Sequence, residues 1–110
     1  MPVKNDYQPR IDPWVDLVSA LPLQLGNSLL THAENYHGAP HNYKSNLNPD
    51  KDSNNFKDWA YDLAFHGRNL VFWARNADSY LITDDGYDEA LEAAKDALRW
   101  VAEYLEHMWD

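Results

Sequence analysis

Residues 85–109 read DGYDEALEAAKDALRWVAEYLEHMW, and this stretch decides the fold class. Its apolar residues alternate at intervals of four and three: Tyr87, Leu91, Ala94, Leu98, Val101, Leu105 and Met108. That spacing is typical of a helix packed side by side with another helix. Asp85 and Gly86 form a turn signal at its start, and acids there complement the helix dipole. We therefore predict an amphipathic helix from about Asp85 to Trp109.

A second group of residues lies along one edge of this apolar stripe and widens the apolar arc to about 200°. Its members are Ala93, Ala97, Trp100, Tyr104 and His107. One neighbouring helix cannot cover so wide an arc. Either two helices of the same bundle cover it, or part of it meets another protein or a second copy of the chain. Because Trp and Tyr favour interface cores, Trp100, Tyr104 and His107 are predicted partner-binding residues.

The opposite side of the same helix is acidic. The chain carries a net charge of −9, and residues 78–110 hold ten acids against two bases. The acidic face consists of Asp88, Glu92, Asp96, Glu103 and Glu106. It is either a solvated helix face or an acidic mimic of nucleic acid that inhibits a basic, nucleic-acid-binding protein. Direct binding to nucleic acid is not expected, because cations are needed to replace condensed counterions.

Two short helices are predicted in the first third of the chain. Asp12 followed by Pro13 is typical of an N-cap and a first helical position, and this helix is expected to end near Leu21. Pro22 is expected to restart or kink the chain. A second helix then follows and ends before Gly38.

A third helix is predicted from a cap at Ser53 or Asn54 to about Asp78. Its apolar stripe consists of Phe56, Trp59, Leu63, Leu70, Ala74 and Ala77. Gly67 lies beside the stripe and would allow close approach by another helix, at a cost of about 1 kcal/mol relative to Ala.

Aromatic and arginine side chains share another face of this third helix: Tyr61, Phe65, Arg68 and Phe72, with Arg75 nearby. Binding hot spots use this combination, so the first four form a second group of predicted partner-binding residues. The alternative is that the third helix is central and that the first helix covers this face.

Together these patterns predict an all-α fold, a small four-helix bundle forming a single domain over residues 1–110. A long polar loop, residues 38–55, would join helices 2 and 3, and a loop of this length is usually functional or mobile. No apolar run approaches the roughly 20 residues that span a bilayer, and the N-terminus does not resemble a signal peptide. A cytoplasmic location without a membrane partner is expected.

Catalytic signatures are absent, so we expect neither enzymatic activity nor a cofactor. The five histidines lack the spacing of a metal site. Glu89-Ala-Leu-Glu92 and Glu103-Tyr-Leu-Glu106 nevertheless resemble the helix-borne acid pairs of magnesium-dependent all-α nucleotide pyrophosphohydrolases. That resemblance implies acids pointing inward from at least two helices, with Asp58 and Asp62 as the donors on the third helix.

The interpretation that the sequence favours is a small acidic helical module that binds another protein. It would act as an inhibitor or adaptor, of the type common among phage and mobile-element products. Self-association into a homo-oligomer is a further possibility that the wide apolar arc leaves open. The acidic mimic and the magnesium-dependent hydrolase are the alternatives.

Overall fold

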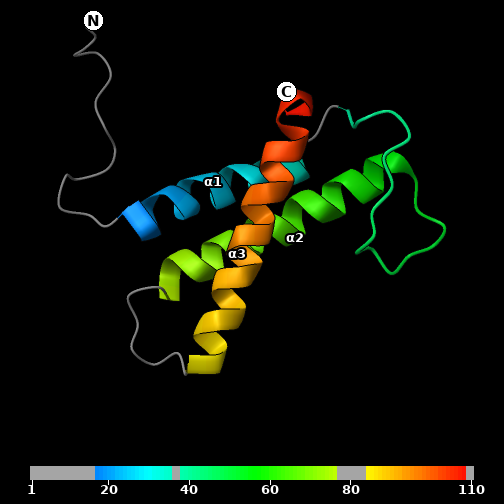
Figure 1. Ribbon diagram of the computed structural model, residues 1–110. Helices are drawn as coiled ribbons and strands as arrows, with labels where there is room; N and C mark the ends of the chain where they lie inside the picture. Colours follow the sequence, from blue (N-terminus) through cyan, green and yellow to red (C-terminus); the bar gives the residue numbers. More distant parts are fainter. Residues whose placement is uncertain (1–16, 36–37, 77–83, 109–110) are drawn as a thin grey trace, which may run out of the picture.

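The computed structural model describes residues 17–35, 38–76 and 84–108. Helix α1 spans Leu17–Glu34, α2 spans Asn55–Asn76, and α3 spans Asp84–Tyr104, followed directly by the 3-10 turn η1, Leu105–His107 (Figure 1). These described residues contain no strand, and the all-α class is confirmed. The expected four-helix bundle is wrong, because three helices form the described part of the chain.

The difference arises at Pro22, which lies inside α1 and does not interrupt it. Pro22 is only the sixth residue of the helix, so its missing N–H removes a single bond near the start of the hydrogen-bond ladder. Its ring is also buried, which favours a continuous path for the chain. The two short predicted helices are therefore one, and residues 12–16 of the first lie outside the described residues.

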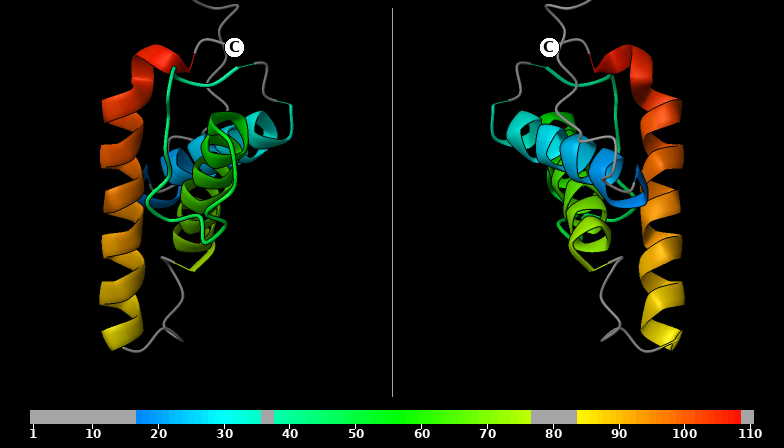
Figure 2. Two further views of the ribbon diagram at one scale, coloured as in Figure 1. Left: turned by 90° about the vertical axis from the view of Figure 1, so that its right-hand side faces the viewer. Right: turned by 90° about the vertical axis from the view of Figure 1, so that its left-hand side faces the viewer.

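Helix α2 is the central element. It packs closely along α1, and α3 crosses it on another side, whereas α1 and α3 share few direct backbone contacts. Figure 2 shows α3 standing to one side of the α1–α2 pair. In the described chain α3 therefore has one close helical neighbour rather than two.

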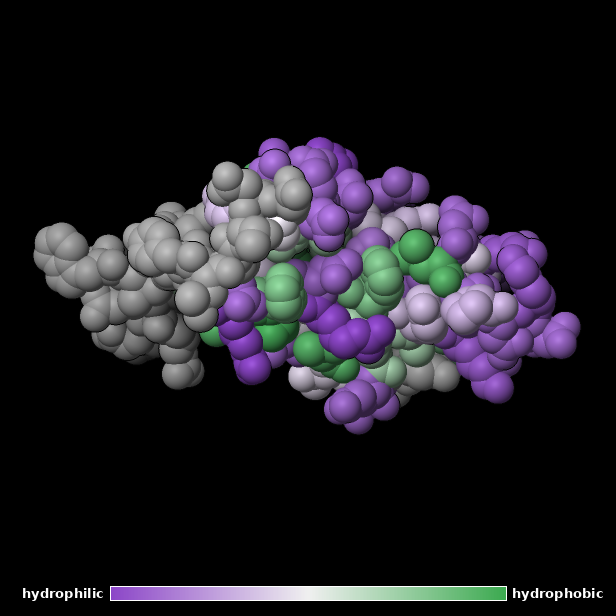
Figure 3. Space-filling model, turned by 90° about the horizontal axis from the view of Figure 1, so that it is seen from below, coloured by the Kyte–Doolittle hydropathy of each residue, from purple (hydrophilic) through white to green (hydrophobic). Residues whose placement is uncertain are grey.

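No described helix has the length and apolar character needed to cross a membrane. On the face seen from below, apolar patches are separated by hydrophilic side chains (Figure 3). Large apolar residues are nevertheless exposed on all three helices and in the loop: Leu21, Leu47, Phe56, Phe72, Tyr87, Leu98 and Leu105. Their positions determine which surfaces are available for binding.

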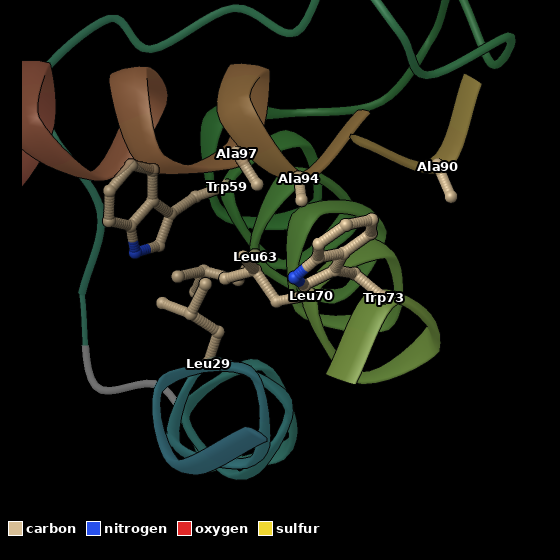
Figure 4. Packing of buried hydrophobic residues seen from close by; sticks show 8 residues of the cluster. All are labelled: Leu29, Trp59, Leu63, Leu70, Trp73, Ala90, Ala94 and Ala97. Carbon is tan, nitrogen blue, oxygen red and sulfur yellow. The ribbon is translucent and has the colours of Figure 1, made fainter. Parts of the chain in front are cut away.

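The core lies between the three helices (Figure 4). Trp59, Leu63 and Leu70 of α2 are completely buried, as the apolar stripe predicted. Burial contributes about 1.5–3 kcal/mol for each leucine. The other members of the core are Leu29 of α1, Trp73 of α2, and Ala90, Ala94 and Ala97 of α3. The small alanine side chains allow the α3 backbone to approach the large indole rings of α2.

Helix α3 is rotated about its axis relative to the prediction. The alanines centre its buried face, while Tyr87, Leu98 and Leu105 are 42%, 44% and 66% exposed. The prediction that these three residues belong to the core is wrong. Trp100 packs instead toward α2. Because the side of α3 that carries Trp100 faces α2, the side that carries Leu98 faces outward.

Helices α1 and α2 cross in backbone contact at Gly26 and Gly67. A Cβ atom at Gly26 would lie 2.8 Å from the Gly67 carbonyl oxygen, and one at Gly67 would lie 2.9 Å from the Gly26 oxygen. The close approach predicted for Gly67 is confirmed. Neither position tolerates a side chain without separating the two helices.

Substitution Gly67→Ala tests this crossing. The added methyl group meets backbone and the Leu30 side chain, so the free energy of unfolding should fall by about 1–3 kcal/mol, despite the better helix propensity of Ala. Urea unfolding monitored by circular dichroism measures the change. Gly38→Ala is the matched control, because a Cβ there meets nothing within 4 Å. Equal stabilities of the two variants would contradict the crossing.

Candidate functional site

Residues 38–54 join α1 to α2 and fold against the N-terminal half of α2. Two acids of α2, Asp58 and Asp62, lie one turn apart and are only 7% and 3% exposed. Buried carboxylates need hydrogen-bond donors, and the polar loop supplies them. The polar residues of the long loop therefore provide these hydrogen bonds.

Asp58 receives three hydrogen bonds from the loop. The backbone N–H of Ser45 donates over 3.1 Å, the side-chain amide of Asn48 donates over 3.0 Å, and the Ser53 hydroxyl also donates. These bonds, above all that from Ser53, lower the pKa of Asp58 below its ordinary value of 3.8. Asp58 is therefore ionised at neutral pH and anchors both ends of the loop segment 45–53.

Asp62 connects the loop to α3. It accepts hydrogen bonds from the Ser45 hydroxyl, at 2.6 Å, and from the Tyr43 hydroxyl. The indole N–H of Trp100 donates to the same Tyr43 hydroxyl over 3.1 Å. Burial, and then the bond to Asp62, raise the pKa of Tyr43, so this phenol remains a donor. The hydrogen-bonded chain Trp100–Tyr43–Asp62 thus links α3, the loop and α2.

Aromatic rings surround this hydrogen-bonded chain. Trp59 lies 5.1 Å from Trp100 and 5.8 Å from Tyr104, measured between ring centroids, while Tyr43 lies 5.0 Å from Trp59. Such pairs contribute about 0.5–1.5 kcal/mol each beyond area burial. The structure therefore places the predicted partner-binding residues Trp100 and Tyr104, both half-buried, in contacts within the chain. His107 is exposed in η1 beside Tyr104.

The second predicted group lies on the outer face of α2. Tyr61 and Phe65 are half-buried and stack with ring centroids 6.4 Å apart, whereas Arg68 and Phe72 are exposed. This face points away from the helix side that carries Trp59 and Leu63. The two predicted groups therefore do not form one continuous surface.

His66 is a buried residue that the site prediction did not include. Its ring is 7% exposed, stacks on Trp100 at 4.7 Å, and has no hydrogen-bond partner at Nδ1. Burial lowers the pKa of His66 below its ordinary value of 6.5, although Asp62 opposes this effect. The fold thus favours the neutral imidazole.

The predicted acidic face is solvent-exposed along α3 and η1. Lys95 lies 3.9 Å from Glu92, and Arg99 lies 2.5 Å from Asp96. Two of the five acids, Glu92 and Asp96, therefore have cationic neighbours on their own helix. The row does not present an uninterrupted series of unpaired carboxylates.

The helix-borne acid pairs do not gather around a cation site. Glu89, Glu92, Glu103 and Glu106 are all exposed, and the oxygens of Asp58 and Asp62 accept hydrogen bonds from the loop. Within residues 17–35, 38–76 and 84–108, no three acidic or histidine side chains cluster as a metal ion would require. The described geometry gives the magnesium-dependent alternative no inward-facing acids on α3.

An apolar groove between α1 and α3 was not identified from the sequence. It has a volume of about 530 Å³ and is lined by Leu21, Pro22, Leu25, Trp73, Leu91, Ala94, Lys95 and Leu98. Lys95 is its one charged lining residue. The signal that could have revealed it is the seven-residue spacing of Leu91 and Leu98, since residues at this spacing share the side of a helix that faces a neighbouring helix.

No protein-family model matches the sequence, and no curated protein or solved structure is significantly similar to it. Function must therefore be inferred from the surfaces themselves. Among these, the groove combines concave shape with an almost wholly apolar lining, which is the usual character of a binding site.

Substitution Tyr43→Phe tests the hydrogen-bonded chain. It removes the hydroxyl shared by Asp62 and Trp100, leaving part-buried polar atoms without partners, and should lower the free energy of unfolding by about 1–3 kcal/mol. Chemical unfolding monitored by tryptophan fluorescence measures the loss. Tyr87→Phe is the control, since that ring is 42% exposed and the change should stay within about 0.5 kcal/mol. Indistinguishable variants would refute the structural role of the Tyr43 hydroxyl.

Burial of His66 predicts a loss of stability in mild acid. Because its pKa is lower in the folded chain than 6.5, the unfolded chain binds the proton first as the pH falls. The contribution of neutral His66 is therefore present above pH 6.5 and declines below it. Unfolding curves at a series of pH values measure the slope. His66→Phe should flatten it in this range, whereas His107→Phe, at an exposed position, should retain it.

Proposed function

We propose that this chain is a protein-binding module whose groove between α1 and α3 receives a basic amphipathic helix of another protein. The observation that carries the proposal is that aliphatic side chains line both walls of the groove. These are Leu21 and Leu25 on α1, and Leu91 and Leu98 on α3. An amphipathic helix placed in such a groove buries its apolar face, which is a recurrent mode of peptide recognition.

The exposed lining supports a binding role over a purely structural one. Leu21 and Leu98 are 53% and 44% exposed on facing walls, so apolar area remains available for burial. Burial is worth roughly 25 cal/mol per Å² of apolar surface. A docked helix would also give α3 the second neighbour that its leucine edge lacks in the described chain.

The net charge of α3 favours a basic occupant, although Lys95, the one charged residue of the groove lining, is itself basic and lies 3.9 Å from Glu92. Helix α3 carries seven acids against two bases, a net charge of −5. Asp88 precedes Leu91 by three residues and so lies beside it on the helix surface. The α1 wall, by contrast, has no acidic or basic residue between Leu17 and Thr31. Lys or Arg along one edge of the incoming helix would therefore meet α3, while its apolar stripe meets both walls.

Such binding suits an inhibitor or adaptor, because it sequesters or recruits a helix without a chemical step. The acidic side of α3 then contributes to partner choice and association rate rather than most of the affinity. This role differs from mimicry of nucleic acid, which would require the acidic row itself to be the contact surface.

A labelled helical peptide of leucine and lysine, patterned to be amphipathic, tests the groove by fluorescence anisotropy. The wild-type chain should bind it, and added salt should weaken the complex through screening. Leu98→Gln removes an aliphatic wall residue and should raise the dissociation constant about tenfold, a loss of about 1.4 kcal/mol.

Leu105→Gln is the matched control. Leu105 lies seven residues further along the chain, at the start of η1, and is 66% exposed, but it does not line the groove. This variant should bind the peptide within about twofold of wild type, which is less than 0.5 kcal/mol. If both substitutions weaken binding equally, or neither does, the groove is not the binding site.

A further inference from the structure

The outer face of α2 carries a strip of cations and aromatic rings distinct from the groove. Its members recur at intervals of three and four residues and therefore share one side of the helix. They are Lys57, Tyr61, Phe65, Arg68, Phe72 and Arg75. We name this set the α2 strip. No acid belongs to it, although the whole chain has twice as many acids as bases.

The cations of the α2 strip are exposed and lack ion-pair partners in the described part of the chain. The ion pairs found there, Lys95 with Glu92 and Arg99 with Asp96, are both on α3. Lys57, Arg68 and Arg75 thus remain available for charge-assisted bonds with another molecule. Phe72 is 55% exposed among them, so its ring is available for contact with an apolar side chain of another molecule.

A hollow beside the α2 strip provides a place for an apolar side chain. It has a volume of about 490 Å³ and lies between α1 and α2. Leu30, Ala33, Ala60 and Ala64 form its apolar part, while Lys57, Tyr61 and Arg68 border it. Glu34 and Asn48 complete the lining, which therefore contains two cations and one acid.

The acidic side of α3 does not cancel the local field of the α2 strip. Helices pack about 8–10 Å apart between axes, and each has a diameter of about 10–12 Å. Outward faces of two packed helices are then roughly 20 Å apart. This is about twice the Debye length at physiological salt, so the acids of α3 contribute little at the strip, where the strip supplies three cations and the hollow supplies the single acid Glu34.

We propose that the α2 strip is a second docking surface, specific for an acidic segment of another protein with apolar residues beside its carboxylates. Arg68 and Arg75 bind the carboxylates, and Phe65 and Phe72 cover the apolar side chains. A long nucleic-acid strand is a poorer match, because its phosphates would extend from the strip into the field of a chain with a net charge of −9.

A labelled, end-capped helical peptide of glutamate and leucine tests the α2 strip, with the full chain and fluorescence anisotropy as the readout. The wild-type chain should bind it. Arg68→Gln and Phe72→Ala should each raise the dissociation constant at least fivefold, because each removes one of the two kinds of contact. Both residues are exposed, and circular dichroism verifies that the variants remain folded.

Arg99→Gln is the matched control, since Arg99 is an exposed arginine on α3 that already pairs with Asp96. It should leave the affinity for the acidic peptide within about twofold of wild type. Leu98→Gln in the groove should also leave it unchanged, which separates this surface from the proposed groove function. A single-stranded oligothymidine of similar length is the competing probe.

Three results would overturn the proposal. The first is failure of the wild-type chain to bind the acidic peptide. The second is equal binding by the wild type and the Arg68→Gln and Phe72→Ala variants. The third is displacement of the labelled peptide by oligothymidine at a lower concentration than by the unlabelled peptide. The last result would assign the α2 strip to nucleic acid through stacking on its rings. Binding that depends on Arg68 and Phe72 but not on Arg99 supports an acidic protein partner.

Discussion

Two buried carboxylates, Asp58 and Asp62, constrain the rest of the structure. A carboxylate removed from water costs several kcal/mol unless donors replace the lost hydration, and α2 alone cannot supply them. Residues 43–53 provide Ser45, Asn48, Ser53 and Tyr43 as donors. The polar composition of the loop is thus a requirement of the helix that follows it. Because the Tyr43 hydroxyl also accepts from Trp100, the same constraint extends to α3.

The orientation of α3 follows from that connection. Trp100 reaches Tyr43, stacks near Trp59 and covers His66, and this edge of α3 must then face α2. An apolar arc of about 200° cannot be covered by one helix, so the opposite edge with Leu98 remains at the surface. The groove between α1 and α3 is the consequence of satisfying two acids elsewhere in the molecule.

Local signals in the sequence predicted much of the fold but not which side of α3 faces α2. Asn54 caps α2 through its bond to the Lys57 N–H, and Gly67 marks the helix crossing, both as expected from local chemistry. Pro22 misled because its effect depends on burial and on its distance from the helix start. Hydropathy predicts that Leu98 is more buried than Trp100. In the structure Trp100 faces α2 and Leu98 is exposed, because Trp100 donates a hydrogen bond to Tyr43, a residue distant in sequence. The sequence pattern indicated Asp58 and Asp62 only as donors to a magnesium ion, because their hydrogen-bond partners in residues 43–53 lie outside the helix.

Net charge is a poor guide to what this chain binds, because its charges are segregated by helix. Seven acids lie on α3, whereas the α2 strip carries cations only. Screening confines each field to roughly 10 Å, so a partner responds to the helix it approaches rather than to the total of −9. On the two proposals made above, one small protein would select two partners of opposite charge. The apolar walls of the groove and the rings of the strip would then supply the affinity that surface charges alone do not provide.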